Sequence, residues 1–467
     1  MSEQYNLPNE VIKFFQEKKG NSLLLKGAPG TGKTIFALTL LGKITEKKNG
    51  IYVTTRINKK HLLTHFPVIN KIMDVDNIVE ATKTKFPDKN NKADIVGLDY
   101  VTMSEFLLSM LDRITGIEEP ILVIDSWDAV IAKLDENRSE SEHDLIDFAS
   151  KTDIRLILIA EYEDNRELDY FVDGIIKLRM NSVQARTQRE MIMEKLRGVA
   201  IKQPTYLFTL DKGMFRSFKP FRLRIPVKQC SIEPIPDPSE DYISTGIEEF
   251  DKLLQGGYRK GSFNLFELKH GVEAKDVLMI APTIINRVNQ KRHVFIFSTE
   301  SIEEQVIENI IQSLSQDSVE DYVKIQSEVL EGVEVPEYVF PAKGESIDED
   351  MAPLLKLRSD NLKEETTMSI LGFDRLEHIY GSKELKRMIW KYLKYFQSNR
   401  QVDIGIVNED QTEIKNLLGP MANTHLKVKL HYNTVLTYGI VPHTGFYVVE
   451  QDPSKNNCLS ASLIPVV

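Results

Sequence analysis

One segment near the start of the chain combines glycine, lysine and threonine at a spacing that can bind phosphate. It reads Gly27-Ala28-Pro29-Gly30-Thr31-Gly32-Lys33-Thr34 and fits the pattern G-x-x-x-x-G-K-[ST]. The glycines let the backbone wrap with its N–H groups pointing inward, and the start of a following helix adds partial positive charge. Lys33 can then reach the β- and γ-phosphates, and the Thr34 hydroxyl can bind Mg²⁺. These eight residues therefore predict a binding site for ATP and Mg²⁺.

A carboxylate follows a second apolar run. Asp125 comes directly after Leu122-Val123-Ile124, which places it at the carboxyl end of a strand, where open α/β sheets bind ligands. We expect Asp125 to complete the magnesium shell opposite Thr34. A capping aspartate at a strand end is the structural alternative.

Two cations lie two residues apart in a later strand-like segment. Lys195 and Arg197 would therefore face the same side of a strand and present two charges to one ligand. Cations supplied across an interface can stabilise a transferring phosphoryl group. The alternative is a solvated strand face.

Alternating strands and helices must position these residues. In the first half we expect strands at 22–26, 51–54, 121–125 and 154–160, with helices such as 104–114 and 141–150 between them. Such alternation predicts a parallel sheet covered by helices on both faces. Consecutive strand-like runs between 173 and 218 predict an antiparallel extension of that sheet.

The second half repeats the pattern. Its expected strands are 262–267, 293–298, 368–373 and 402–407, and its expected helices are 274–288, 302–315 and 383–398. Residues 51–56 align with 295–300, and residues 121–127 align with 370–376. A tandem duplication is the simplest explanation, with two unrelated α/β domains as the alternative. We expect an ATP-binding domain at 1–225, a proline-containing linker at 226–241 and a second domain at 242–467.

Composition narrows the function classes. The net charge of -10 disfavours a primary role in binding nucleic acid or an anionic membrane. No apolar run approaches a membrane span and the first residues are not a signal peptide, so we expect a cytoplasmic protein. The two cysteines, Cys230 and Cys458, are too far apart in sequence to suggest a disulfide framework or a thiol zinc site.

The segment from Ile243 to Ser262, ISTGIEEFDKLLQGGYRKGS, resembles the opening signature of KaiC-like ATPases of the RecA superfamily. The pair Asp125-Ser126 and the run Lys195-Leu196-Arg197-Gly198 support that resemblance in the first half. It covers nearly the whole chain and implies two tandem RecA-like P-loop domains, each a mostly parallel sheet flanked by helices with antiparallel C-terminal strands. It also implies a homo-oligomer, such as a hexameric ring, in which Lys195 and Arg197 reach the γ-phosphate bound by the neighbouring subunit.

The residues Leu7-Pro8-Asn9-Glu10 and Thr54-Thr55-Arg56 further resemble archaeal GvpD-type regulatory P-loop proteins. This resemblance implies control of transcription through a protein partner.

The first half departs from the KaiC-like pattern at one catalytic position. Those ATPases carry glutamates after the second strand to activate water, whereas this chain has Arg56 and Ile57. A guanidinium cannot accept a proton. We expect Arg56 to bind the γ-phosphate or sense its loss, and Glu161, after the strand 154–160, to serve as a substitute base.

The second half has the reverse pattern. Its loop position, residues 267–276, carries acidic and bulky side chains instead of glycines, so we expect no nucleotide there. Glu300 and Asp374 are expected at the positions of the base and the magnesium ligand, as relics of ancestry, with a role toward another partner as the alternative.

The first hypothesis is a slowly hydrolysing regulatory ATPase with a degenerate second domain for assembly or partner binding. The second is a nucleotide-gated scaffold that does not hydrolyse ATP. A third class is a recombination or repair accessory factor like the RadA paralogues, which the acidic balance and the lack of an N-terminal helical DNA-binding module count against.

Overall fold

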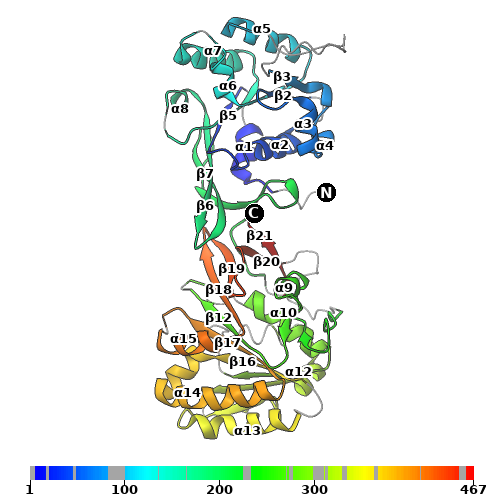
Figure 1. Cartoon of the computed structure of the whole chain (residues 1–467), viewed down its shortest axis with the longest axis vertical. Coiled ribbons are helices and arrows are strands. Elements are labelled where there is room, and N and C mark those ends of the chain that lie inside the picture. Colours follow the sequence, from blue (N-terminus) through cyan, green and yellow to red (C-terminus); the bar gives the residue numbers. More distant parts are fainter. Residues whose placement is uncertain are drawn as a thin grey trace. The chain divides into compact units, whose positions relative to one another are not determined.

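The chain forms two compact units in the computed structural model (Figure 1). Unit 1 comprises residues 1–219 with 466–467, and unit 2 comprises residues 220–465. The structure describes residues 6–16, 20–45, 49–81, 100–134, 136–164, 166–224, 233–269, 271–272, 277–297, 310, 314–328, 334–361, 366–410, 412–451 and 459–467.

Unit 1 is built on one nine-stranded sheet. Its strands, in spatial order, are β3 (Ile78–Glu80), β2 (Gly50–Thr54), β4 (Ile121–Asp125), β5 (Arg155–Ala160), β1 (Ser22–Lys26), β6 (Gly174–Val183), β7 (Arg186–Leu196), β8 (Thr205–Thr209) and β9 (Arg216–Ser217). The strands from β3 to β6 are parallel, and β6 to β9 are antiparallel.

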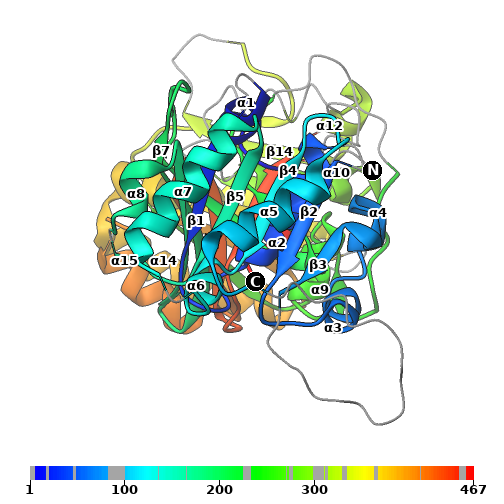
Figure 2. The ribbon, with the colours of Figure 1, turned by 90° about the horizontal axis from the view of Figure 1, so that it is seen from above.

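Helices cover both faces of this sheet. They are α1 (Asn9–Gln16), α2 (Lys33–Ile44), α3 (Lys59–His65), α4 (Ile69–Ile72), α5 (Met103–Ile114), α6 (Trp127–Ile131), α7 (Arg138–Lys151) and α8 (Leu168–Phe171). Leu23 and Leu25 of β1 pack into the core formed with α1 and α2, whereas Leu24 packs into the core formed with α5 and α7. Figure 2 shows α5 and α7 lying across the strands. Burial on both faces explains the continuous apolar runs of the central strands.

Unit 2 is built on a ten-stranded sheet. Its strands, in spatial order, are β15 (Val339–Ala342), β14 (Val323–Glu328), β13 (Val294–Phe297), β16 (Met368–Gly372), β17 (Val402–Asn408), β12 (Phe263–Leu268), β18 (Thr424–His431), β19 (Thr434–Val441), β20 (Tyr447–Gln451) and β21 (Ala461–Pro465). Its helices include α9 (Glu248–Leu253), α10 (Val277–Asn289), α12 (Gln316–Tyr322), α13 (Ile347–Asp360), α14 (Phe373–Ser398) and α15 (Thr412–Leu418). The strands from β15 to β18 are parallel, and the remaining strands are antiparallel.

The two sheets share one strand order, with β15 as an extra edge strand in unit 2. The predicted fold class is therefore confirmed: each unit is a mostly parallel sheet flanked by helices and extended by antiparallel C-terminal strands. The four strands predicted with limits in the first half, now β1, β2, β4 and β5, begin and end within one residue of those limits, whereas β3 was not predicted.

Strand registers test the proposed alignment of the halves. Tyr52 of β2 lies beside Val123 of β4, and Ile296 of β13 lies beside Ile370 of β16. With residues 51–53 aligned to 295–297, these registers also align the first residues of the neighbouring strands, Ile121 of β4 and Met368 of β16. Glu300, the expected counterpart of Arg56, lies outside the described residues.

The alignment of Asp125 with Asp374 is wrong by two residues. Asp125 lies beside Ile159, and the corresponding neighbour pair in unit 2 is Gly372 and Ile406. Asp374 instead lies in the first turn of α14, where its side chain is buried and accepts a hydrogen bond from Asn408 at 2.8 Å. The apolar run of β16 continues into Phe373 of the helix, so hydrophobicity alone did not mark the strand end.

Two other expectations need qualification. The predicted helix 383–398 matches the part of α14 that follows the non-helical Gly381, and α14 itself begins earlier, at Phe373. Most of the predicted helix 302–315, and the linker residues 226–232, lie outside the described residues, as do both cysteines. None of the described helices is long and apolar enough to cross a membrane.

The opening signature of the second half has a structural role. The carboxylate of Asp251 in α9 accepts hydrogen bonds from the Ser244 hydroxyl at 2.6 Å and from the backbone and hydroxyl of Thr245, both at 2.7 Å. Gly257 has a φ of 87°, and a Cβ there would lie 2.2 Å from the carbonyl oxygen of Ile243. The signature thus closes a turn that only glycine fits.

A buried ion pair supports the core of unit 2. The guanidinium of Arg358 lies 2.7 Å from the Asp403 carboxylate, and both side chains are fully buried. The guanidinium also donates to the Thr367 hydroxyl at 3.0 Å and stacks 3.9 Å from the ring centroid of Phe396.

We predict that Arg358→Met lowers the free energy of unfolding by about 3 to 5 kcal/mol, because Asp403 would remain buried without its cation. Denaturant unfolding of the full chain measures this change. The matched control is Arg387→Met, at an exposed ion pair in the same unit, where we expect a loss below about 1 kcal/mol. Equal losses in both variants would contradict the prediction.

Candidate functional site

The glycine-rich loop after β1 packs tightly against the antiparallel part of the sheet. A Cβ on Gly27 would lie 2.4 Å from the carbonyl oxygen of Leu178 in β6. Gly32 has a φ of 100°, and a Cβ there would lie 2.8 Å from Leu210. Packing against the backbone therefore requires glycine at position 27, whereas at position 32 the positive φ is what favours glycine, because the Leu210 side chain can move.

The Lys33 ammonium lies inside the loop. Its Nζ donates to the carbonyl oxygens of Gly27 at 2.6 Å and Ala28 at 2.9 Å. Burial lowers the pKa of Lys33, while the charges of Glu161 and Asp125 oppose that effect. The lysine, these carboxylates and the loop backbone thus converge at the carboxyl edge of the sheet.

Asp125, the last residue of β4, is hydrogen-bonded to the start of α2 and to β2. Its Oδ2 accepts hydrogen bonds from the Thr34 hydroxyl at 2.7 Å and the Tyr52 hydroxyl at 2.6 Å. Burial and the Asp125 charge raise the pKa of Tyr52, so this phenol remains a donor. Adjacent hydroxyl and carboxylate oxygens are the hard ligands that Mg²⁺ prefers, so Thr34 and Asp125 fit a magnesium site.

Tyr52 was not singled out from the sequence, although a signal was present. It is the one aromatic residue in an otherwise aliphatic or small-residue strand, and its side chain is fully buried. A buried tyrosine hydroxyl usually finds a partner. The pattern could not indicate that the partner is Asp125.

Arg56 and Glu161, expected to have separate roles, contact each other. Arg56 Nη1 lies 2.6 Å from Glu161 Oε1, and the two side chains are 50% and 25% exposed. The backbone N–H of Glu161 donates to Asp128 Oδ2 at 2.8 Å, and Asp128 Oδ1 accepts from Arg138 at 2.9 Å. The structure therefore brings Lys33, Thr34, Asp125, Arg56 and Glu161 to one edge of the sheet.

Arg189 is a further cation at the loop that sequence reasoning missed. It lies on β7, and its Nη1 donates to the carbonyl oxygens of Gly30 at 3.2 Å and Thr31 at 3.3 Å. Burial lowers the pKa of this guanidinium. No sequence motif marked Arg189, because its position depends on the register of the β6–β7 hairpin.

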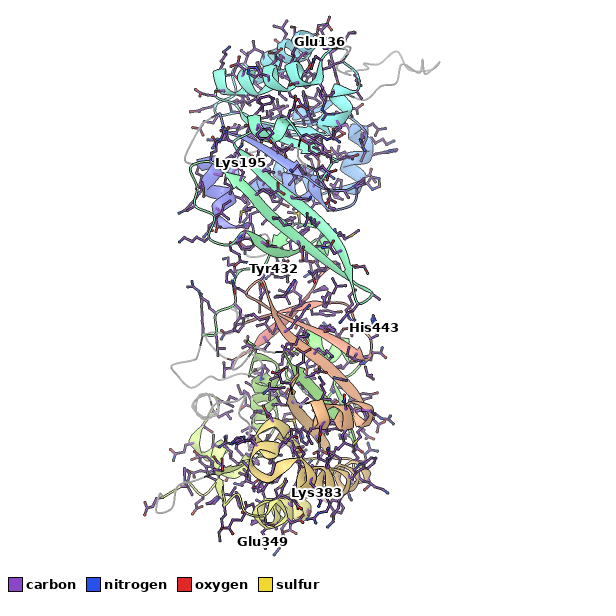
Figure 3. All side chains as sticks on the ribbon, turned by 90° about the vertical axis from the view of Figure 1, so that its left-hand side faces the viewer. Glu136, Lys195, Glu349, Lys383, Tyr432 and His443 are labelled. Atoms are coloured by element: carbon purple, nitrogen blue, oxygen red, sulfur yellow. The ribbon has the colours of Figure 1, made fainter. Side chains whose placement is uncertain are left out.

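Lys195 and Arg197 do not contact the loop of their own chain. Lys195 Nζ donates to the carbonyl oxygens of Asp169 at 3.1 Å and Val172 at 2.6 Å, and Arg197 lies 3.3 Å from the Asp173 carboxylate. Figure 3 shows Lys195 at the open end of the long β6–β7 hairpin, away from its turn. Arg197 follows the end of β7, yet both cations reach the same segment.

The corresponding strand end in unit 2 is closed by ion pairs. By register, Glu267 of β12 corresponds to Lys26 of β1, and Leu268 corresponds to Gly27, the first residue after β1. The Glu267 carboxylate is 2% exposed and lies 3.0 Å from His425 and 2.9 Å from Lys427. Burial raises the pKa of Glu267, but hydrogen bonds from His425 and Lys427 and the charges of Lys427 and Lys415 outweigh it and lower the value to about 2. His270 and residues 273–276 lie outside the described residues.

No group of three or more His, Cys, Asp or Glu side chains that could hold a metal ion occurs in the described part of the chain.

Residues 11–194 match the family model described as the P-loop domain of the GvpD gas vesicle protein. Over 268 residues the chain is 29% identical to protein GvpD2 of Halobacterium salinarum, a match covering 55% of this chain and 54% of that relative. It is 29% identical over 300 residues to protein GvpD1 of the same organism, covering 61% and 54%. It is 20% identical over 387 residues to the circadian clock oscillator protein KaiC of Synechococcus elongatus, covering 78% and 72%.

The chain thus spans about half the length of the GvpD relatives that it matches. Unit 1 contains a GvpD P-loop domain, and the chain is homologous to the GvpD proteins and more distantly to KaiC. These matches confirm the resemblance inferred from the sequence, to GvpD-type P-loop proteins and, more distantly, to KaiC.

We predict that Tyr52→Phe lowers the free energy of unfolding by about 2 kcal/mol, because the partly buried Asp125 carboxylate would lose a hydrogen bond from a fully buried hydroxyl. Denaturant unfolding measures the loss, with Tyr170→Phe as the control because Tyr170 is 76% exposed. If Tyr52→Phe is as stable as the control, the hydrogen bond to Asp125 contributes nothing to folding.

We predict that Glu267→Gln destabilises the protein at neutral pH by on the order of 3 kcal/mol, because the depressed pKa of Glu267 reflects stabilising contacts of its charged form. This contribution is present above the pKa of the unfolded state, about 4.3. It is lost as the pH falls toward about 2. Unfolding curves of wild type and variant should therefore converge between these pH values. A pH-independent difference would contradict the prediction.

Proposed function

We propose that the protein is a regulatory ATPase that binds Mg-ATP at the loop of unit 1 and hydrolyses it slowly. The observation that carries this proposal is the convergence of the glycine-rich loop, Lys33 and the Thr34–Asp125 hydrogen bond at one sheet edge. The match of residues 11–194 to a P-loop family supports it.

The loop residues Gly27 to Thr34 would wrap the phosphates of ATP, with the backbone N–H groups and Lys33 as donors. Thr34 and Asp125 would hold Mg²⁺, which neutralises phosphate charge when bound. In that state the Thr34 hydroxyl would exchange its hydrogen bond to Asp125 for the cation.

Glu161 would act as the general base. It lies one residue beyond the end of β5, and its charge acts on Lys33 more strongly than any other charged group. Arg56, at the position where KaiC-like ATPases carry a glutamate, would bind the γ-phosphate. The base would then come from a different strand than in those ATPases, which is consistent with slow turnover.

Lys195 and Arg197 would act on the nucleotide of a neighbouring subunit, in a homo-oligomer such as a hexameric ring. Their position away from the loop of their own chain favours action in trans. In that arrangement the interface completes the active site, so turnover depends on assembly.

Unit 2 would provide a surface for assembly or for a regulatory protein partner in the cytoplasm of an archaeon. The salt-bridged Glu267, in place of a lysine at the strand end, supports a domain that does not bind nucleotide. A carboxylate at this point would repel phosphate.

A nucleotide-gated scaffold without turnover is the second candidate. The observation that favours it is the Arg56–Glu161 ion pair, because Arg56 holds the carboxylate that would otherwise accept the proton from water. ATP binding would then change the assembly state without hydrolysis.

We predict that purified protein releases ADP from Mg-ATP, and that turnover per subunit rises with protein concentration because Lys195 and Arg197 act across an interface. Lys33→Ala should reduce turnover at least about 100-fold. The control Lys43→Ala, an exposed residue on the same helix, should match wild type.

Tight ATP binding without ADP release would favour the scaffold, and absence of ATP binding would refute both candidates. Strong stimulation by single-stranded DNA would instead support a recombination factor.

A further inference from the structure

The ion pair between Arg56 and Glu161 joins the segments that follow two strands, and a third strand lies between these two in the sheet. Arg56 lies two residues beyond the end of β2, Glu161 lies one residue beyond the end of β5, and β4 with Asp125 lies between these strands in the sheet. The contact is 2.6 Å long, yet Arg56 is half exposed. An ion pair of this exposure contributes little stability, so a stronger anion can replace Glu161 at low cost.

The pair lies beside the residues that would hold the phosphates. Asp125 ends β4, the strand between β2 and β5, and its Oδ2 accepts a hydrogen bond from the Thr34 hydroxyl at 2.7 Å. Thr34 follows Lys33, whose Nζ lies inside the loop on the carbonyl oxygens of Gly27 and Ala28. A phosphate bound at this loop would therefore approach the edge of the sheet at which both members of the pair lie.

A terminal phosphate is a better partner for Arg56 than a single carboxylate. It carries more negative charge, and its oxygens match the two-pronged geometry of a guanidinium. ADP offers no such group at this point, because it lacks the γ-phosphate.

We propose that Glu161 and the γ-phosphate of ATP compete for Arg56, so that ATP breaks the ion pair and frees Glu161, whereas ADP leaves the pair closed. This inference rests on the proposed binding of ATP at the loop. Free Glu161 accepts a proton from water as the water oxygen bonds to the γ-phosphorus and the bond to the ADP oxygen breaks. Glu161 then returns the proton to the released phosphate.

The backbone around both residues is fixed, which confines the exchange to the side chains. Thr55, before Arg56, donates its hydroxyl to the carbonyl oxygen of Asp125 at 3.0 Å. Thr54 donates its hydroxyl to the carbonyl oxygen of Ile57 at 2.6 Å. The backbone N–H of Glu161 is held by Asp128 at 2.8 Å. Arg56 can thus turn to a phosphate while Glu161 keeps its position.

A double-mutant cycle tests this competition. We would measure the dissociation constants of Mg²⁺ with the β,γ-imido analogue of ATP, and of Mg-ADP, by titration calorimetry. The proteins are wild type, Arg56→Ala, Glu161→Gln and the double variant. Arg56→Ala should weaken the binding of the analogue at least about 10-fold and the binding of ADP less than about 2-fold. Glu161→Gln should strengthen the binding of the analogue about 3- to 10-fold in the wild-type background. In the Arg56→Ala background, Glu161→Gln should leave the affinity for the analogue unchanged.

The cycle separates competition from a simple field effect. If Glu161→Gln raises the affinity for the analogue equally in the wild-type and Arg56→Ala backgrounds, Glu161 acts only as a nearby negative charge and the proposal is wrong. The proposal would also be wrong if the ratio of analogue affinity to ADP affinity were the same in Arg56→Ala as in wild type. Arg56 would then not bind the γ-phosphate.

Two controls complete the design. Arg155→Ala removes an ion pair of similar length, 2.8 Å to Glu119, at the amino end of β5, and should leave both affinities unchanged. If wild type binds neither nucleotide, or Lys33→Ala binds both as well as wild type does, the proposed ATP site itself fails. That outcome differs from a failure of the competition alone.

Discussion

The site of unit 1 depends on the hydrogen bonds that the carboxylate of Asp125 accepts. This carboxylate receives hydrogen bonds from Thr34 at the start of α2 and from Tyr52 on β2, while its own residue ends β4. The backbone carbonyl of Asp125 also accepts from Thr55. One residue thus sets where the phosphate loop begins its helix and where the chain leaves β2. The placement of Arg56 follows from it, because Arg56 comes directly after Thr55.

The two units show what a change of charge at a strand end does to this architecture. In unit 1, Lys26 ends β1 and pairs with Asp169 at 2.8 Å and Glu194 at 3.1 Å. In unit 2, the equivalent Glu267 is surrounded by His425, Lys427 and Lys415. Both ends are buried and neutralised, but the cations of unit 2 are already satisfied by a protein carboxylate. A phosphate entering there would have to displace Glu267 and meet its negative charge.

The sequence was sufficient for the loop and the central strands, but not for β3, β14 and β15 at the outer side of each sheet or for contacts between strand ends. Continuous apolar runs mark β1, β4 and β5 because both faces of a parallel sheet are buried. The expected positions of Lys33 and Thr34 follow from motif spacing, and that of Asp125 follows from its place after an apolar run. The Arg56–Glu161 contact could not be predicted, because it requires the spatial order β2, β4, β5, and Arg189 required the hairpin register. The misplacement of Asp374 has a related cause, since an apolar strand that runs directly into an apolar helix start leaves the register undetermined.

Arg56 replaces a residue that KaiC-like ATPases use to activate water, and its contact with Glu161 gives that replacement a physical consequence. A guanidinium at this position cannot accept a proton, but it can hold the carboxylate that we propose as the base. Under that proposal the base is present in the folded chain but stays paired with Arg56 until a stronger anion replaces it. The binding free energy of the γ-phosphate would then release Glu161. Slow turnover and selectivity for a triphosphate would both follow from this one pair of side chains.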